Sequence, residues 1–234
     1  MKVLYSIYII LIVCIFSACS SPKKLVFRDD FSKGKLSQKW DIVNGDWSVN
    51  NACLSGSRTS DDWGIILSRK KLPENYLLTF SALSDSAANL FEIIANLKGE
   101  KFFGIMQNQL EEAIKLEDRS LFSPENRIKE KTLVCTTGNI GQLPEINYPN
   151  SREWLHWKIL RTGNHIYIWI NDEDVISFTD KIDLLNTKGK FGFIISGKVQ
   201  IKNIHLYSLK KEEALPPQNF EGRPLVWRMF LFGG

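Results

Sequence analysis

The chain has 234 residues and a formal net charge of +4, from 30 Lys or Arg and 26 Asp or Glu residues. This charge is weak and evenly spread, which does not favour a nucleic-acid-binding protein. Hydrophobic residues make up 44% of the chain. A domain of roughly 200 residues buries about 70% of its unfolded surface, so this chain requires neither a metal nor a disulfide to fold.

The N-terminal segment has the composition of an export signal. Lys2 precedes an uncharged apolar run, residues 3–16, and the small residues 17–18 lead to Cys19. A charged start, an apolar stretch and small residues are typical of a cleaved signal peptide. A cysteine after such residues resembles the lipobox of bacterial lipoproteins, in which the cysteine is lipidated and becomes the mature N-terminus. Phe16 stands where the lipobox usually has Leu.

The alternative is an uncleaved membrane anchor. The apolar run is shorter than the roughly 20 residues that span a bilayer, and lysines follow it at positions 23 and 24. We therefore expect a signal peptide at 1–18, a lipidated tether at 19–24, one domain at 25–209 and a Pro-containing tail at 210–234. Both interpretations place the domain outside the cytoplasm. If Cys19 is lipidated, the domain is held in the cell envelope by its lipid anchor. In a host with two membranes it would be at the outer membrane or the periplasmic face.

The rest of the chain reads as short strands separated by turn residues. β-Branched and aromatic residues dominate these runs, and no long amphipathic helix interrupts them. The expected strands are 25–31, 40–43, 46–49, 52–55, 64–68, 76–82, 90–97, 102–107, 113–116, 132–136, 154–161, 165–171, 175–178, 190–196 and 199–209. Asn44-Gly45 and Asn50-Asn51 suit tight hairpin turns, and 180–186 could form one helical turn. This pattern predicts an all-β sandwich or jelly roll.

Alternation along two strands assigns their faces. The residues expected to face the core are Leu155, Trp157, Ile159, Ile166, Ile168 and Ile170. The residues expected on the opposite, outer face are His156, Lys158, His165, Tyr167 and Trp169. One sheet should therefore present an outer face rich in His, Lys and aromatic groups.

Several segments together resemble a known fold family. They are Phe27-Arg-Asp-Asp-Phe31, Trp40-Asp41, Gly45-Asp-Trp47, Glu153-Trp-Leu-His-Trp-Lys-Ile159, His165-Ile-Tyr-Ile-Trp-Ile-Asn171, Gly189-Lys-Phe-Gly-Phe193 and Val199-Gln-Ile-Lys-Asn-Ile204. This order resembles the concanavalin A-like jelly roll in its laminin-G-like form, including bacterial domains grouped with 3-keto-disaccharide hydrolases. The resemblance implies a jelly-roll β-sandwich of two antiparallel sheets over about 25–209. Its motifs concern structure more than catalysis.

Glu92 is the candidate catalytic carboxylate. Glycosidases need two carboxylates about 5–9 Å apart, and laminarinase-type members of this superfamily place theirs at alternate positions of one strand. In residues 90–96 only Glu92 is acidic, since Ile94 and Asn96 occupy the alternate positions. The sequence therefore does not support that mechanism, and Glu92 is alternatively an edge or outward-facing carboxylate.

Metal and disulfide sites are open questions at the sequence level. By resemblance to related jelly rolls, Asp29 and Asp30 on the opening strand are candidate ligands of a structural calcium. The histidines at 156, 165 and 205 are polar surface residues in the simpler interpretation. Cys53 and Cys135 could form a disulfide or remain two separate buried thiols. No other cofactor is expected.

The candidate ligand-binding residues are the outer-face groups and one loop tryptophan: Tyr167, Trp169, His156, Lys158, His165 and Trp63. Aromatic rings on that face could stack on sugar rings, or could instead pack under a loop or under the tail. The apolar end of the tail, residues 226–234, could cover the domain or dock on a partner. We therefore expect a non-catalytic envelope lipoprotein that binds glycan or another envelope component. The alternative is a glycoside hydrolase like the 3-keto-disaccharide hydrolases.

Overall fold

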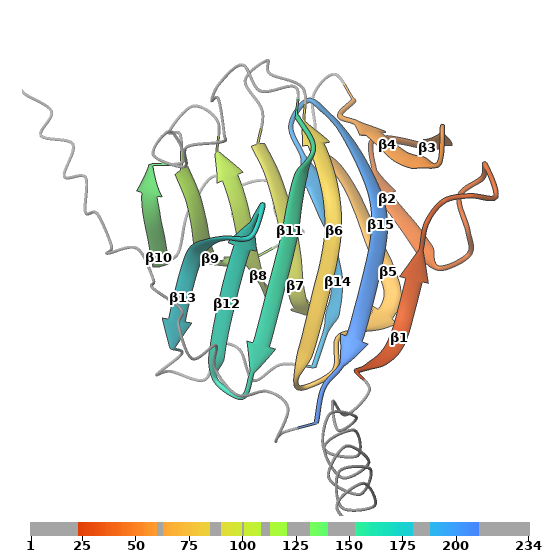
Figure 1. The fold of residues 1–234 in the computed structure, drawn as a ribbon. Helices are drawn as coiled ribbons and strands as arrows, with labels where there is room; N and C mark the ends of the chain where they lie inside the picture. The colour runs from red at the N-terminus through yellow and green to blue at the C-terminus, as the bar shows by residue number, and fades with distance from the viewer. Residues whose placement is uncertain are drawn as a thin grey trace, which may run out of the picture.

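The computed structural model describes residues 23–59, 63–84, 90–99, 101–108, 113–120, 132–139, 153–179 and 188–210. In these ranges the chain is an all-β sandwich of two antiparallel sheets (Figure 1). The expected fold class is therefore confirmed. No helix in the described part is long and apolar enough to cross a membrane. The expected signal peptide and Cys19, residues 180–186 and most of the tail lie outside the described residues.

The front sheet faces the viewer in Figure 1. It has the order β13 (Glu173–Thr179), β12 (His165–Ile170), β11 (Leu155–Thr162), β6 (Tyr76–Ser84), β15 (Lys198–Ser208), β4 (Cys53–Ser57) and β3 (Asp46–Asn50), and β1 (Lys24–Asp29) also pairs with β15. The back sheet has the order β10 (Thr132–Asn139), β9 (Ala113–Ser120), β8 (Lys101–Asn108), β7 (Leu90–Lys98), β14 (Lys190–Ile195), β5 (Gly64–Lys71) and β2 (Trp40–Asn44).

The core between the sheets is built by strand alternation. Ile166, Ile168 and Ile170 are fully buried in it, as expected from their spacing. Trp157 is 1% exposed and stacks on Phe80, with ring centroids 5.9 Å apart. These contacts fix which faces of β11 and β12 point inward, and hence which side chains point outward.

The expected hairpin at Asn50-Asn51 is confirmed, and the turn at Asn171-Asp172 is a hairpin as well. Asn51 and Ala52 have positive φ between β3 and β4, and Asn171 and Asp172 have positive φ between β12 and β13. The expected hairpin at Asn44-Gly45 is wrong, because β2 pairs with β5 in the back sheet whereas β3 pairs with β4 in the front sheet. Gly45 makes this crossing tight, since a Cβ there would lie 2.5 Å from the Gly64 Cα.

The two cysteines lie far apart. Cys53 is a free, buried thiol on β4. Cys135 is on β10, which contacts β13 at the opposite edge of the front sheet. β4 and β13 are five strand spacings apart, and adjacent strands are about 4.8 Å apart, giving roughly 24 Å. Cys53 is free in the described structure, and this separation of the strands favours separate thiols, so the disulfide stays a prediction.

Candidate functional site

An open groove of about 620 Å³ lies on the outer face of the front sheet. It crosses β6, β11 and β15 and is bordered by the β12–β13 turn; we call it the β11 groove. The residues lining it are Thr79, Phe80, Ser81, Trp154, His156, Trp157, Lys158, Asn171, Asp172, Asn203 and His205. Most of these carry polar side chains, so the floor of the groove can form many hydrogen bonds.

Strand register places the polar side chains of the groove in two rows. In one row, His205 on β15 pairs with Thr79 on β6, which pairs with Lys158 on β11. In the other, Ser81 on β6 pairs with His156 on β11. Residues two apart on a strand share a face, so both rows point away from the core.

Hydrogen bonds fix the border of the groove at the start of β11. The His156 amide donates to Asn171 Oδ1 at 2.9 Å, and the Asn171 amide donates to the His156 carbonyl at 2.9 Å. The His156 ring Nδ1 lies 2.8 Å from the Ser81 hydroxyl. Lys158 forms an ion pair with Asp172 on the same turn. The imidazole and the ammonium are thus held in defined positions before any ligand binds.

The other border is formed by β15 and Trp154. The Lys202 ammonium lies 3.8 Å from the centroid of the Trp154 ring, in cation–π contact. Asn203, with φ 56°, sits at an irregularity in the pairing of β15 with β6. Such a bulge inserts an extra residue into the strand, which brings the Asn203 side chain into the lining of the groove.

The groove can bind a polyhydroxylated ligand by hydrogen bonds. Its ammonium, imidazole, amide and hydroxyl groups provide donors and acceptors in close proximity. Among its described lining residues, Asp172 is the one carboxylate, so they do not provide the acid pair of a glycosidase.

The structure divides the sequence-predicted binding residues among three places. His156 and Lys158 line the groove. His165, Tyr167 and Trp169 form a stacked row on β12, with successive ring centroids 6.2 and 6.1 Å apart. They share the outer face as expected.

Two of the candidate aromatic residues lie in settings that do not favour stacking on a ligand. Tyr167 is 6% exposed, so its ring does not offer a stacking surface, and burial raises the pKa of its hydroxyl. Trp63 is not on this face, because it packs against an apolar cluster of the back sheet. Since Trp63 precedes Gly64 at the start of β5, it belongs to the other layer of the sandwich.

Glu92 is buried at the centre of the back sheet. Its strand, β7, lies between β8 and β14, so it is not at an edge. Glu92 alternates with the core residues Phe91 and Ile93, so it faces away from the inter-sheet core, as the outward-facing alternative expected. The exposed fraction of Glu92 is 0%, and its paired neighbours are Met106 and Ile194. This apolar setting does not resemble a solvent-accessible catalytic pair, and it lies in the other sheet from the β11 groove.

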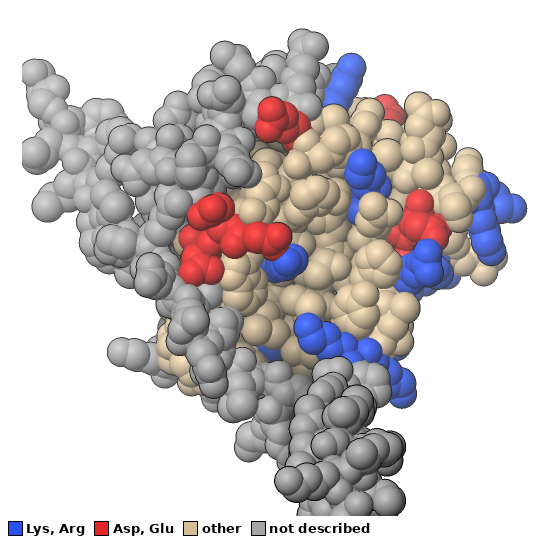
Figure 2. Space-filling view, viewed as in Figure 1, with Lys and Arg blue, Asp and Glu red and all other residues tan. Residues whose placement is uncertain are grey.

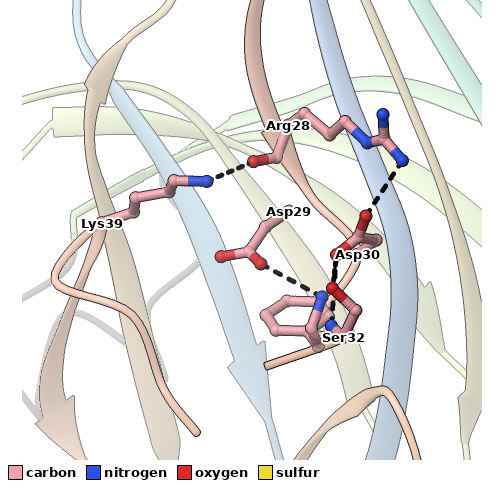
Figure 3. A network of polar contacts seen from close by, with 6 residues as sticks. Arg28, Asp29, Asp30, Ser32 and Lys39 are labelled. Atoms are coloured by element: carbon pink, nitrogen blue, oxygen red, sulfur yellow. Dashed lines mark hydrogen bonds and ion pairs between the residues drawn. The ribbon is translucent and has the colours of Figure 1, made fainter. Parts of the chain in front are cut away.

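The Asp29–Asp30 pair is occupied by protein donors (Figure 3). Asp29 accepts hydrogen bonds from the Phe31 amide at 3.2 Å, the Ser37 hydroxyl at 2.9 Å and the Trp40 indole at 2.9 Å. Asp30 accepts from Ser32 and pairs with Arg28 at 3.0 Å. The described residues contain no group of three His, Cys, Asp or Glu side chains that could hold a metal ion. The pair therefore fits a loop-fixing role better than a calcium site, and calcium stays a prediction.

Sequence reasoning missed part of the groove. It grouped His156 and His165 among the candidate binding residues, but β11–β12 register places these residues at opposite ends of the strand pair. His205 shares the groove with His156 instead, because β6 is inserted between β11 and β15. That strand order joins residues more than 70 positions apart, and no local pattern reveals it. Trp154 and Asn203 lie inside the expected strands 154–161 and 199–209, but nothing in the local sequence marked them as groove residues.

These features define a concanavalin A-like or galectin-like jelly roll with a polar groove on its front sheet. No family model matches the chain, and no curated protein matches its sequence. Solved structures match its fold. A protein of unknown function with a galectin-like fold from Bacillus subtilis has a TM-score of 0.62 at 12% identity, with 80% of this chain and 97% of that chain covered.

Two further solved structures link the fold to carbohydrates. A carbohydrate binding module from Bacillus subtilis has a TM-score of 0.56 at 16% identity, with 73% of this chain and 96% of that chain covered. The laminarinase from Rhodothermus marinus has a TM-score of 0.54 at 12% identity, with 79% and 96% covered. The fold therefore occurs in both non-catalytic modules and glycoside hydrolases, and fold alone does not decide between them.

Proposed function

We propose that this protein is a non-catalytic glycan-binding protein of the cell envelope, and that the β11 groove is its binding site. The observation that carries the proposal is the convergence of His156, Lys158, Asn203 and His205 on one open groove. Ligand sites are usually concave, with a few polar groups that fix the ligand's orientation.

The chemistry of the groove suits sugar hydroxyl groups. A hydroxyl both donates and accepts a hydrogen bond, so it matches a surface that mixes amides, imidazoles and a charged pair. Hydrogen bonds to charged groups such as Lys158 and Asp172 are the stronger ones. Similarity of fold to a carbohydrate binding module supports glycan binding in general.

The competing hypothesis is a glycoside hydrolase. Similarity to a laminarinase favours it, and Glu92 is the described carboxylate that the sequence singled out. Against it stand the burial of Glu92 and the isolation of Asp172 as the carboxylate among the described groove residues. If the protein cleaves a glycan and Glu92→Gln abolishes that cleavage, the hydrolase hypothesis replaces the binding proposal.

We also propose that Cys19 carries the lipid anchor. The proposal stands on the lipobox-like segment and on its position just before the domain. Cys19→Ser should abolish incorporation of labelled fatty acid and release the domain from the membrane fraction. Retained labelling in Cys19→Ser contradicts the proposal.

A broad glycan array tests the binding site. Wild-type protein should bind a subset of glycans, and the double variant His156→Ala with His205→Ala should lose that signal. His165→Ala is the matched control, because it removes a histidine from the same face but outside the groove. The absence of any bound glycan, or equal loss in the control, contradicts the assignment of the groove.

A further inference from the structure

One end of the sandwich is rich in lysine. This is the lower end in Figure 1, where β1 begins and β15 ends. The lysines at this end are Lys23, Lys24, Lys70, Lys71, Lys98, Lys101, Lys188, Lys190 and Lys210, of which Lys190 is half-buried and the others are exposed. We call this surface the basic end.

Strand register shows that these lysines share one end of the molecule. In the back sheet Lys71 pairs with Lys190, and Lys98 pairs with Lys101 across the β7–β8 turn. In the front sheet Lys24 pairs with Ser208, near the end of β15. The connection 72–75 joins the two sheets here, because it links the end of β5 to the start of β6.

Little acidic charge opposes the basic end in the described part of the chain. Glu74 lies 3.9 Å from Lys188, and Asp41 is shared between Arg69 at 2.7 Å and Lys190 at 3.5 Å. The pKa of Asp41 is lowered, mainly by its hydrogen bond with Arg69. Lys23, Lys24, Lys70, Lys71, Lys98 and Lys101 therefore have no ion pair among the described residues.

The opposite end has the opposite sign. Its described acidic residues are Asp46, Glu153, Asp172, Glu173 and Asp174, against Arg58, Lys198 and Lys158, the ion-pair partner of Asp172. Figure 2 shows acidic side chains gathered over the β12–β13 turn beside a basic one, and basic side chains at the lower end as well as at the upper and right-hand edges of this face. The domain is thus polarised in charge along its strand direction.

A depression beside β1 adds an apolar element to the basic end. It has a volume of about 550 Å³ and is lined by Leu25, Val26, Phe27, Arg28, Lys39, Arg69 and Lys70. Leu25 is 45% exposed, an unusual position for a large apolar side chain beside so many cations. An apolar floor with a cationic rim matches the chemistry of a phospholipid headgroup and the start of its acyl chain.

The position of the chain's N-terminal segment points to the same partner. Cys19 lies five residues before Lys24, and an extended chain of that length spans at most about 18 Å. A lipid on Cys19 would therefore hold the basic end close to the bilayer.

We propose that the basic end docks on a bilayer surface containing anionic phospholipid. The lysines contact the headgroup phosphates, and Leu25 reaches the interface. This inference draws on the proposed anchor for its proximity to the bilayer, and is independent of the glycan-binding proposal. Docking in this way directs the acidic end away from the membrane and leaves the β11 groove open on the side of the domain.

A lysine-labelling footprint tests the docking. The full acylated chain is reconstituted in vesicles of phosphatidylcholine alone, or with about one third phosphatidylglycerol, and treated with an amine-reactive reagent that does not cross membranes. We expect modification of Lys24, Lys71 and Lys210 to fall at least about threefold in the anionic vesicles, because lysines near such a surface are attracted to it. Lys198, at the other end, should be unaffected, and about 1 M salt should restore labelling by screening.

Two charge variants sharpen the test. Lys98→Glu with Lys101→Glu should remove the protection of the remaining lysines at the basic end. The matched control, Arg58→Glu with Lys198→Glu, makes the same change in charge at the opposite end. This control should retain the protection of the lysines at the basic end.

The docking proposal is overturned if the wild-type lysines are labelled equally in the two kinds of vesicle. It is also overturned if the two charge variants show equal protection of the lysines in anionic vesicles. Mass spectrometry of the chain decides separately whether Cys19 carries lipid. If it does not, the same footprint, read with vesicles in excess, still decides whether the basic end docks.

Discussion

Neighbouring positions on β11 should respond to substitution in opposite ways. Trp157 is 1% exposed, stacks on Phe80 and contacts Phe91 edge-on at 6.1 Å. Lys158, the next residue, is 46% exposed and pairs with an Asp172 that is 77% exposed. The Trp157 side chain packs in the inter-sheet core beneath the groove, whereas the Lys158 side chain lies on the outer face, where the groove is open.

The expected magnitudes differ severalfold. Trp157→Ala removes a large buried ring and leaves a cavity, which should lower the free energy of unfolding by about 3–5 kcal/mol. Lys158→Ala loses an exposed ion pair, worth at most about 1 kcal/mol. Since domains are typically stable by about 5–15 kcal/mol, the first variant should be close to unfolding and the second should fold normally.

Urea unfolding followed by circular dichroism measures both values. A glycan-binding assay on the same samples should show that Lys158→Ala, although folded, has lost affinity. The assignment of faces is refuted if Trp157→Ala is as stable as wild type, or if Lys158→Ala loses more than about 2 kcal/mol.

Three smaller tests address other sites. The Tyr76 hydroxyl is fully buried with no hydrogen-bond partner among the described residues, and burial raises its pKa to about 12. Tyr76→Phe should therefore increase the free energy of unfolding by about 1 kcal/mol. A decrease in that free energy would contradict this prediction. Hydrogen bonds from Ser32 lower the pKa of Asp30 to about 2, so its stabilising contribution is present above pH 4 and lost as the pH falls toward 2. An NMR titration that gives Asp30 an ordinary pKa near 3.8 refutes this pH dependence. Asp29→Ala leaves three donors unpaired and should cost roughly 1–3 kcal/mol in chemical denaturation, more than Asp30→Ala does.

Local patterns predicted the strands and their faces well. Period-two alternation in 155–159 and 166–170 correctly assigned inward and outward residues, because one face of each strand is buried. The same reasoning failed at Asn44-Gly45, since a tight turn between two strands does not show whether those strands share a sheet.

The site was predictable only in part. His156 and Lys158 were identified from alternation, but His205 joins them through the placement of β6 between β11 and β15. The burial of Tyr167 depends on tertiary packing, and the saturation of Asp29 depends on a side chain eleven residues away, Trp40. Sequence spacing carries neither kind of information.

The three histidines of the chain offer the most direct test of the β11 groove as a glycan site. The imidazole resonances of ¹³C-labelled histidine are followed by NMR while the glycan selected on the array is titrated in. His156 and His205 line the groove, whereas His165 is on β12 outside it and bonds Thr179 at 2.9 Å. A glycan bound in the β11 groove should cause saturable shifts for His156 and His205 and leave the resonances of His165 unchanged. Shifts confined to His165, or none at all from a glycan that binds, would contradict it.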